Sequence, residues 1–186
     1  MLCEPVQFDG YTYDVVVIGC DCWFAENLRS DNYNDGTAIP GGLSSSEWAS
    51  TTEGAQTFYD GDSATYFEDY GRMYNWFAVI ESSALCPAGW HVPSWAEWWN
   101  LPGWAADLKA SESDAPSWNG TNATGFTATP GGYRYDGAWY GVGSQGRWWT
   151  STISNFGSPM SMVMRSWDNG VTGDSNPISY GLASSV

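Results

Sequence analysis

The pattern of apolar and polar residues predicts one strand early in the chain, followed by a polar stretch. The segment YTYDVVVIG (11–19) alternates apolar and polar positions before a β-branched run, which predicts a strand that enters the core. CWFAENLRS (22–30) predicts a short helical turn. Residues 44–70 are polar and rich in Gly, Asp and Thr. They predict a long ordered loop that contains short helical pieces.

Two segments in the middle of the chain have helical patterns. YGRMYNWFAV (70–79) places Met73 and Trp76 at helical spacing, and this predicts the first long helix. A second helix is predicted after Ser94, because Ser94 and Glu97 have the spacing of a capping box before an apolar run. Pro102 and Gly103 should interrupt it.

From residue 125 onward, Gly and Pro separate short apolar and aromatic segments, and no helical period exceeds one turn. This pattern predicts short strands. Helices followed by strands give an α+β fold class with segregated elements. A chain of 186 residues is the size of one domain, so we expect a single domain over 1–186.

Charge divides the chain unevenly. The formal net charge of −15 argues against nucleic acid or an anionic membrane as a partner, because both require clustered Lys or Arg. All of this excess lies in residues 1–118, whereas residues 119–186 are neutral. We interpret 1–118 as an acidic scaffold part; the alternative is that the C-terminal part is simply more buried. No apolar run is long enough to span a membrane, so no membrane insertion is expected.

The chain contains four cysteines, Cys3, Cys20, Cys22 and Cys86. A bond between Cys20 and Cys22 is sterically poor, so a bond from one of them to Cys3 or Cys86 is favoured. A zinc site is disfavoured because the paired CxxC spacing is missing.

Catalytic and metal-binding patterns are scarce. His91 is the only histidine and lies in a turn bounded by prolines, which predicts a structural imidazole bonded to backbone. A hydrolase is an alternative if His91 or a pair of carboxylates lines a concave pocket. No cofactor is predicted. Calcium is the most plausible ion, through DNYNDG (31–36) or YDGDS (59–63), but neither has EF-hand spacing, and solvated acidic turns are expected there.

Several blocks in order carry a resemblance to a known family: DGYTYDVVVIG, WFAENLRSDNYNDGTAIP, DSATYFEDYGRMYNWFAV, LCPAGWHVPSWAEWWNL, NGTNATGFTATPGGYRYDG and WWTST. Together they resemble the Fibrobacter succinogenes major paralogous domain family, over nearly the whole chain. The resemblance implies a C-type lectin-like fold, related in architecture to the formylglycine-generating enzymes. It also implies a variable protein of a diversity-generating retroelement, whose C-terminal segment is rewritten so that a rigid scaffold displays varied side chains.

Two departures narrow what the resemblance implies. No cysteine follows Cys86, whereas the catalytic cysteines of formylglycine-generating enzymes lie late in their chains. The usual calcium motifs of lectins are also missing, since WDN (167–169) is only a permuted form of one of them. Neither the oxidase activity nor a calcium-dependent sugar site is therefore expected.

The region 133–180 is the predicted variable, ligand-binding region. It mixes Tyr and Trp with Ser, Gly and Asn in a neutral frame, as antibody paratopes do. Residues that match the family frame are read as scaffold: Gly132, Gly137, Gly143, Gly146, WWTST (148–152) and Val171. The residues predicted to be displayed are Asp136, Ala138, Trp139, Tyr140, Ser144, Arg147, Ser154, Asn155, Phe156, Ser158, Arg165, Trp167, Asp168 and Asn169. Trp139, Tyr140, Arg147 and Trp167 would be the anchors, and ordinary packing is the alternative for each.

The sequence thus predicts a ligand-binding display protein rather than an enzyme. Its partner would be a protein or a cell-surface ligand, and its location the cell surface, the secreted fraction or a virion. A monomer is favoured over an oligomer. The alternative in another class is an invariant adhesin-like or structural domain, with a hydrolase or formylglycine-type oxidase less favoured.

Overall fold

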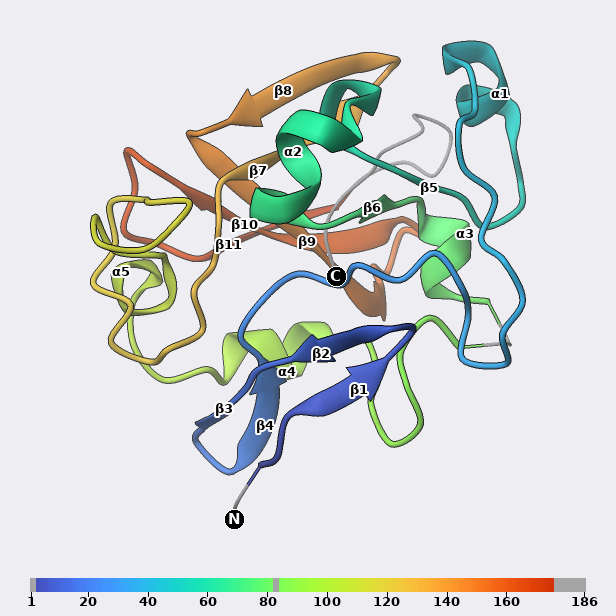
Figure 1. Ribbon diagram of the computed structural model, residues 1–186. Coiled ribbons are helices and arrows are strands. Elements are labelled where there is room, and N and C mark those ends of the chain that lie inside the picture. The colour runs from blue at the N-terminus through green and yellow to red at the C-terminus, as the bar shows by residue number, and fades with distance from the viewer. Residues whose placement is uncertain (1–2, 82–83, 176–186) are drawn as a thin grey trace.

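The largest element of the protein is a five-stranded mixed sheet. The computed structural model describes residues 3–81 and 84–175 (Figure 1). The sheet has the order β11-β10-β9-β7-β8, and all neighbours are antiparallel except β7 and β9, which are parallel. Its strands are β7 (Gly131–Tyr135), β8 (Ala138–Val142), β9 (Gln145–Ile153), β10 (Pro159–Arg165) and β11 (Thr172–Ser175). The strand-rich second half is confirmed, and so is the α+β class.

Three small antiparallel pairs precede the sheet. They are β1 (Val6–Phe8) with β2 (Tyr11–Tyr13), β3 (Val15–Ile18) with β4 (Asp21–Phe24), and β5 (Gln56–Thr57) with β6 (Met73–Tyr74). The predicted strand 11–19 is therefore two strands, β2 and β3. The helical turn predicted at 22–30 is wrong, because Cys22–Phe24 pair with the β-branched Val15–Val17 in a hairpin that turns at Gly19.

The helices are short. They are α1 (Ser45–Ser50), the 3-10 turn η1 (Tyr59–Gly61), α2 (Ser63–Tyr70), α3 (Trp76–Val79), α4 (Trp95–Trp99) and α5 (Ala105–Leu108). Short helical pieces within 44–70 are confirmed. The long helix predicted over 70–79 is wrong for most of its length, because Gly71 ends α2 with a positive φ of 67° and β6 follows. Helix resumes only after Asn75, whose side chain caps α3 at the Ala78 N–H.

The helix predicted after Ser94 is confirmed together with its interruption. Ser94 and Glu97 form a complete capping box on α4, and α5 begins after Pro102 and Gly103. Helix α4 packs against β9 and β10. In Figure 1 it lies between the five-stranded sheet and the two N-terminal hairpins β1–β2 and β3–β4.

Strand β9 is buried on both of its faces. Trp148 belongs to one hydrophobic cluster and lies 6.0 Å from Trp98, between ring centroids. Trp149 belongs to a second cluster and lies 5.4 Å from Trp76. The frame role predicted for WWTST is confirmed for both tryptophans, each of which is 2% exposed. Gln145–Thr150 are all buried, so the predicted display residue Arg147 lies within the buried part of this strand.

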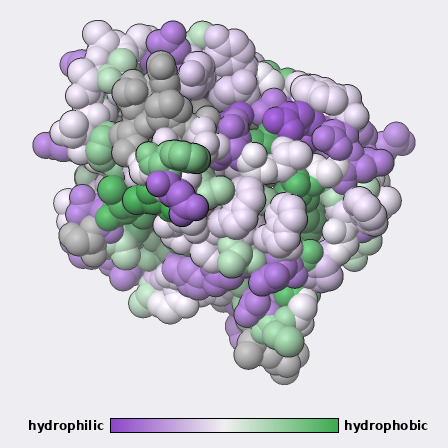
Figure 2. All heavy atoms as spheres, turned by 180° about the vertical axis from the view of Figure 1, so that it is seen from behind, coloured by the Kyte–Doolittle hydropathy of each residue, from purple (hydrophilic) through white to green (hydrophobic). Residues whose placement is uncertain are grey.

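A disulfide joins Cys3 to Cys22 with the Cα atoms 5.9 Å apart. The bond therefore runs from one member of the CxC pair to Cys3, as predicted, and leaves Cys20 exposed and Cys86 buried as free thiols. None of the helices in 3–81 and 84–175 is long and apolar enough to cross a membrane. The face shown in Figure 2 is mixed, with small apolar areas separated by hydrophilic residues.

Candidate ligand-binding surface

The predicted display residues lie mainly on the turns of the five-stranded sheet. Strands β7, β9 and β11 run in one direction and β8 and β10 in the other. The β7–β8 and β9–β10 turns are therefore at one end of the sheet, and the β8–β9 and β10–β11 connections at the opposite end. The structure brings the candidates together as two groups at the two ends rather than as one surface. The predicted region 133–180 extends past residue 175, and 176–180 lie outside the described residues.

The β9–β10 turn (154–158) has a fixed backbone and an outward side chain. The Ser154 N–H donates to the Ser158 carbonyl over 2.8 Å, and the Gly157 N–H donates to the Ser154 carbonyl over 2.9 Å. Phe156 at the tip is 94% exposed and Asn155 is exposed, while Ser154 and Ser158 are half-buried. This turn holds a bulky aromatic ring in solvent on an ordered support.

The β10–β11 turn is anchored from below by a buried lysine. The Lys109 ammonium donates to the carbonyls of Arg165 (3.1 Å) and Asp168 (3.3 Å), although Lys109 is 0% exposed. Burial lowers the pKa of Lys109, and the Asp168 carboxylate opposes that shift. Trp167, between the two carbonyls in sequence, is 70% exposed, and Asn169 is exposed too.

Three half-buried candidate residues form hydrogen bonds within the protein at this same end of the sheet. The Ser144 carbonyl accepts hydrogen bonds from the Ser166 N–H (2.8 Å) and from the Ser166 hydroxyl (2.9 Å). Arg165 donates to the Thr172 hydroxyl over 2.7 Å. The Asp168 carboxylate accepts from the Gly170 N–H over 2.8 Å. The hydrogen bonds of these three residues therefore help to hold the turn, although each residue is also partly exposed.

The β7–β8 turn depends on the backbone of its own candidate residue. Tyr135 pairs with Ala138, so Asp136 and Gly137 form a two-residue loop, and both have positive φ (48° and 76°). Positive φ at both positions is typical of a type I′ hairpin turn, which favours Asn or Asp followed by Gly. Asp136 and Ala138 are exposed. The turn thus constrains the identity of Asp136, whereas Ala138 is an exposed residue of β8.

The two aromatic anchors predicted on β8 differ. Trp139 is half-buried, and the Arg134 guanidinium lies 5.1 Å from its ring and 5.1 Å from that of Trp48. Burial lowers the pKa of Arg134. Its guanidinium lies between the two indole rings, in cation–π contact with both. Tyr140 is 44% exposed and stacks on Tyr133 with centroids 5.5 Å apart. Tyr140 offers a contact surface, and Trp139 mainly holds the hairpin.

Arg147 was predicted to point outward, and this is wrong. It is 5% exposed, lies 4.4 Å over the Tyr133 ring and forms an ion pair with Asp174 at 3.0 Å. Burial lowers its pKa, while Asp174 raises it. The reason is that its side chain lies on a covered face of the sheet, between Tyr133 of β7 and Asp174 of β11. Arg147 belongs to the frame.

The sequence interpretation missed two exposed tryptophans, Trp104 (72% exposed) and Trp99 (66% exposed). The N–H of Ala105 donates to the Asn169 carbonyl over 3.1 Å, so Trp104 borders the β10–β11 turn. A signal was available: Trp104 follows the helix break at Pro102 and Gly103, where no apolar period requires it to be buried.

His91 was predicted to be bonded to backbone, and this is also wrong. Its ring is exposed, and Nε2 lies 2.9 Å from the Glu97 Oε1 atom. Glu97 uses its other oxygen for the capping box, which turns the carboxylate toward His91. Burial raises the pKa of Glu97, but hydrogen bonds from Ser94 and His91 outweigh burial and lower it, which keeps Glu97 ionised. His91 and Glu97 both line a cavity of about 380 Å³.

The buried thiol in this cavity is not a nucleophile. Cys86 lines the same space, and burial raises its pKa to about 12. A thiol with that pKa stays protonated at neutral pH.

Three carboxylates of the two acidic turns proposed for calcium are bonded to the protein itself. Asp31 pairs with Arg72 at 2.8 Å, Asp35 accepts from the Thr37 N–H over 2.9 Å, and Asp62 caps α2. In the ranges that the structure describes, no three His, Cys, Asp or Glu side chains are grouped closely enough to hold a metal ion.

The geometry defines an α+β domain with ordered turns that carry exposed aromatic side chains. A family model described as the Fibrobacter succinogenes major domain matches residues 16–180. The chain therefore belongs to this family, and the resemblance identified from the sequence is confirmed. No match is found among curated proteins or among solved structures.

Proposed function

We propose that this protein is a ligand-binding display module with a C-type lectin-like fold, the variable protein of a diversity-generating retroelement. It binds a protein or a cell-surface ligand through the turns of its sheet and catalyses no reaction. In this proposal it acts as a monomer at a cell surface, in the secreted fraction or on a virion.

One observation carries the proposal: large aromatic side chains stand in solvent on two turns and on the edge strand β8, where the backbone is held by hydrogen bonds. Phe156 is 94% exposed, Trp167 70% and Tyr140 44%. Exposed rings of this size cost solubility without a compensating role, and aromatic residues on rigid supports are typical contact residues of binding surfaces. They lose few rotatable bonds on binding, which is also why antibody paratopes use them.

The positions best suited to exchange are those that do not hold their own turn. Ala138, Asn155, Phe156, Trp167 and Asn169 are exposed, and the hydrogen bonds that fix their turns use backbone groups or other side chains. Asp136, Trp139 and Arg147 have structural contacts and are expected to vary less.

Two libraries test the division into frame and display. In the first, Ala138, Asn155, Phe156 and Trp167 are randomised; in the second, Gln145, Trp148, Trp149 and Thr150 are. We expect most members of the first library to fold with a nearly unchanged melting temperature and to yield binders on selection against a protein target. Most members of the second should fail to fold. Equal tolerance in both libraries would contradict a frame that is separate from the display.

The retroelement itself is tested at the gene. A near-copy of the coding region for residues 135 to 176, beside a reverse-transcriptase gene and differing at template adenines, is the expected finding. A locus without such a copy favours the alternative, an invariant adhesin-like domain of the same family.

A second candidate, a hydrolase, rests on the position of His91 and Glu97 at the cavity. Because Cys86 offers no thiolate, such an enzyme would have to activate water with His91 as the base. Hydrolysis of nitrophenyl esters or glycosides that is lost in His91→Asn would support it. Activity that survives the substitution, or no activity in either protein, removes this candidate.

A further inference from the structure

Strand β8 is an open edge of the five-stranded sheet. It is the last strand in the order β11-β10-β9-β7-β8, and its one partner among the described strands is β7. Figure 1 shows β8 at the border of the molecule. Its residues, Ala138–Val142, include no charged residue and no proline, which are common devices that protect an edge strand from further pairing. The edge can therefore accept another strand.

Two residues of β8 direct backbone groups toward its open side. Ala138 and Tyr140 pair with β7 at hydrogen-bonded positions, because a two-residue turn joins the strands. Trp139 and Gly141 alternate with them, so their backbone groups point away from β7. The Gly141 carbonyl accepts from the Ser144 N–H over 2.9 Å. The Trp139 N–H, the Trp139 carbonyl and the Gly141 N–H have no such partner among the described residues, and they are the groups that an added strand would bond.

Acidic side chains lie beside this edge. Asp136 is in the turn that precedes β8, and Asp60 is in η1, which packs against β8. Both are exposed, and neither forms a hydrogen bond or an ion pair among the described residues. The cations of the neighbouring strands, Arg134 and Arg147, are only 4% and 5% exposed. Because the whole chain has a net charge of −15, the edge attracts a cationic partner and repels an anionic one.

Both faces of the edge offer aromatic rings to the side chains of an added strand. On one face the Trp139 ring lies 5.2 Å from that of Tyr59, which lies 5.1 Å from that of Tyr66. Tyr140 is on the other face, since successive residues of a strand alternate, and it is 44% exposed. Aromatic rings pack against the methylene stems of Lys and Arg and attract their charged ends. The rings and the carboxylates thus favour the same kind of partner.

Charge distinguishes the possible occupants of the edge. A second copy of this chain would bring the same net charge of −15 to the contact, and an acidic segment would be repelled for the same reason. We propose that β8 pairs with an extended, basic segment of a partner protein, which adds a strand to the sheet. This contact rests on the proposed function, in which the ligand is a protein, and deepens it. Its backbone hydrogen bonds stay the same whichever side chains the turns display.

The test uses the purified full chain and three seven-residue peptides with blocked ends. The first peptide alternates Lys and Val, and the second alternates Glu and Val. The third has the side chains of the first but a methyl group on every backbone nitrogen. Measured by calorimetry at low salt, only the first should bind, with a Kd of about 0.1–1 mM. The methylated peptide keeps the charge but has no backbone donor, so it separates strand pairing from attraction by charge alone.

Hydrogen exchange followed by NMR locates the contact on the protein. When the Lys–Val peptide binds, the Trp139 and Gly141 amides should exchange at least about tenfold more slowly, because a hydrogen-bonded amide must open before it exchanges. The amides of Trp167 and Asn169, on the β10–β11 turn, should exchange as before.

A pair of variants tests the outward N–H of β8. Trp139→Ala removes the ring, whereas Trp139→Pro removes both the ring and the N–H. Proline is tolerated at an edge position whose N–H faces solvent. We expect Trp139→Pro to bind the Lys–Val peptide about tenfold more weakly than Trp139→Ala. Melting temperatures verify that both are folded, and the methylated peptide tests the same hydrogen bonds without a change in the protein.

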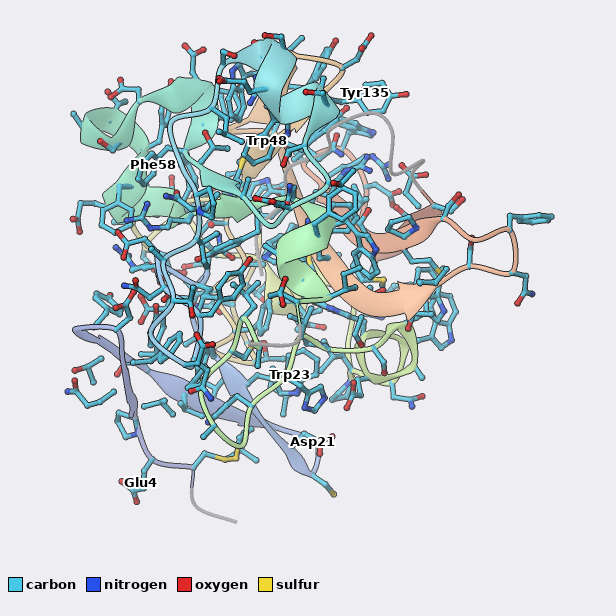
Figure 3. The ribbon with its side chains drawn as sticks, turned by 90° about the vertical axis from the view of Figure 1, so that its right-hand side faces the viewer. Glu4, Asp21, Trp23, Trp48, Phe58 and Tyr135 are labelled. Carbon is cyan, nitrogen blue, oxygen red and sulfur yellow. A yellow bond between two sulfur atoms is a disulfide. The ribbon has the colours of Figure 1, made fainter. Side chains whose placement is uncertain are left out.

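A second pair of variants tests the charges beside the edge. Asp60→Asn with Asp136→Asn removes two carboxylates, and Asn suits the positive φ of both positions. This double variant should weaken peptide binding about fivefold. Glu4→Gln with Asp21→Asn is the matched control: both residues are exposed, and Figure 3 shows them at the end of the molecule opposite Tyr135. The control should leave the affinity nearly unchanged.

Several results would overturn this contact. They are no binding of the Lys–Val peptide, equal binding of the Glu–Val or the methylated peptide, equal affinities of Trp139→Pro and Trp139→Ala, and equal weakening by the two double variants. A dimer of the chain in sedimentation that dissociates on Trp139→Pro would assign the edge to a second copy instead. None of these results bears on whether the turns bind a protein, because the two randomised libraries test the turns separately.

Discussion

The turns of the sheet and the cavity beneath it use the same residue type in opposite ways. At the turns, Phe156 and Trp167 are exposed while the backbone that carries them is hydrogen-bonded. In the cavity, Trp23 and Trp98 are buried while their own N–H groups have no partner in the described residues. One region keeps its polar groups satisfied and leaves apolar surface in water. The other hides apolar surface and leaves polar groups unsatisfied. Each arrangement costs free energy.

The largest effect should separate frame aromatics from turn aromatics. Trp149→Ala removes a buried indole that packs on Trp76 and bonds to Tyr74, so we expect the free energy of unfolding to fall by about 3–5 kcal/mol. Trp167→Ala on the exposed turn should change it by less than about 0.5 kcal/mol. Urea denaturation followed by circular dichroism measures both. Similar losses of stability for the two variants would contradict the distinction between frame aromatics and turn aromatics.

The next effect tests the support of the cavity wall. The Cys3–Cys22 disulfide ties the N-terminal segment to β4 across a sequence separation of 19 residues. Cys3→Ser should lower the free energy of unfolding by about 3 kcal/mol. Cys20→Ser, which replaces an exposed free thiol, is the matched control and should have little effect. Calorimetry in the absence of reductant checks the pair, and a stable Cys3→Ser protein would show that the wall needs no covalent support.

Alkaline pH should weaken the cluster around Trp149. Burial raises the pKa of Tyr33 from 10.0 to about 12, with help from Glu81 and Asp35. Since the folded pKa is above the unfolded one, the stabilisation is complete below pH 10 and is lost as the pH rises toward 12. We expect a loss of about 1–2 kcal/mol from this residue. Unfolding of the protein and of Tyr33→Phe at several alkaline pH values measures it, and identical pH slopes would refute the contribution.

The smallest effect compares a satisfied indole with an unsatisfied one. Trp118 donates to the Ser166 hydroxyl over 2.9 Å, whereas the Trp98 N–H has no partner in the described residues. Replacing either with Phe removes similar ring area, but only Trp118→Phe also breaks a hydrogen bond. We therefore expect Trp118→Phe to lose about 1 kcal/mol more in the free energy of unfolding. A larger loss in Trp98→Phe would mean that its N–H already has a partner.

Local sequence signals predicted the elements that depend on local contacts. The capping box of Ser94 and Glu97 starts a helix, and Pro102 with Gly103 interrupts it. Gly and Pro after residue 125 correctly indicated strands and turns. The buried role of Trp148 and Trp149 followed from the family frame. In contrast, apolar spacing over 70–79 suggested one helix, and two local features overrode it: the positive φ of Gly71 and the cap at Asn75.

What the sequence could not predict depends on strand order and on distant contacts. Arg147 is buried because the strand order brings Tyr133 of β7 and Asp174 of β11 against its guanidinium, and no local pattern specifies that order. The cavity joins Trp23, Trp98 and Trp148 from three distant segments, so its existence is a property of the tertiary structure alone. For the same reason the residues predicted to be displayed form two groups, since alternate turns of a sheet lie at opposite ends.

Lys109 is one of several buried or half-buried Lys and Arg residues, and their burial bears on cleavage of the protein by trypsin. The chain has six Lys and Arg residues in total, all of them in the described ranges, and each is buried or half-buried. Trypsin needs an accessible Lys or Arg in a segment that can unfold locally into its active site. The native protein should therefore resist trypsin even though its aromatic turns are open to solvent. Cleavage would report the opening of the fold as a whole, and exchange of the exposed turn residues would preserve this resistance as long as it introduced no Lys or Arg.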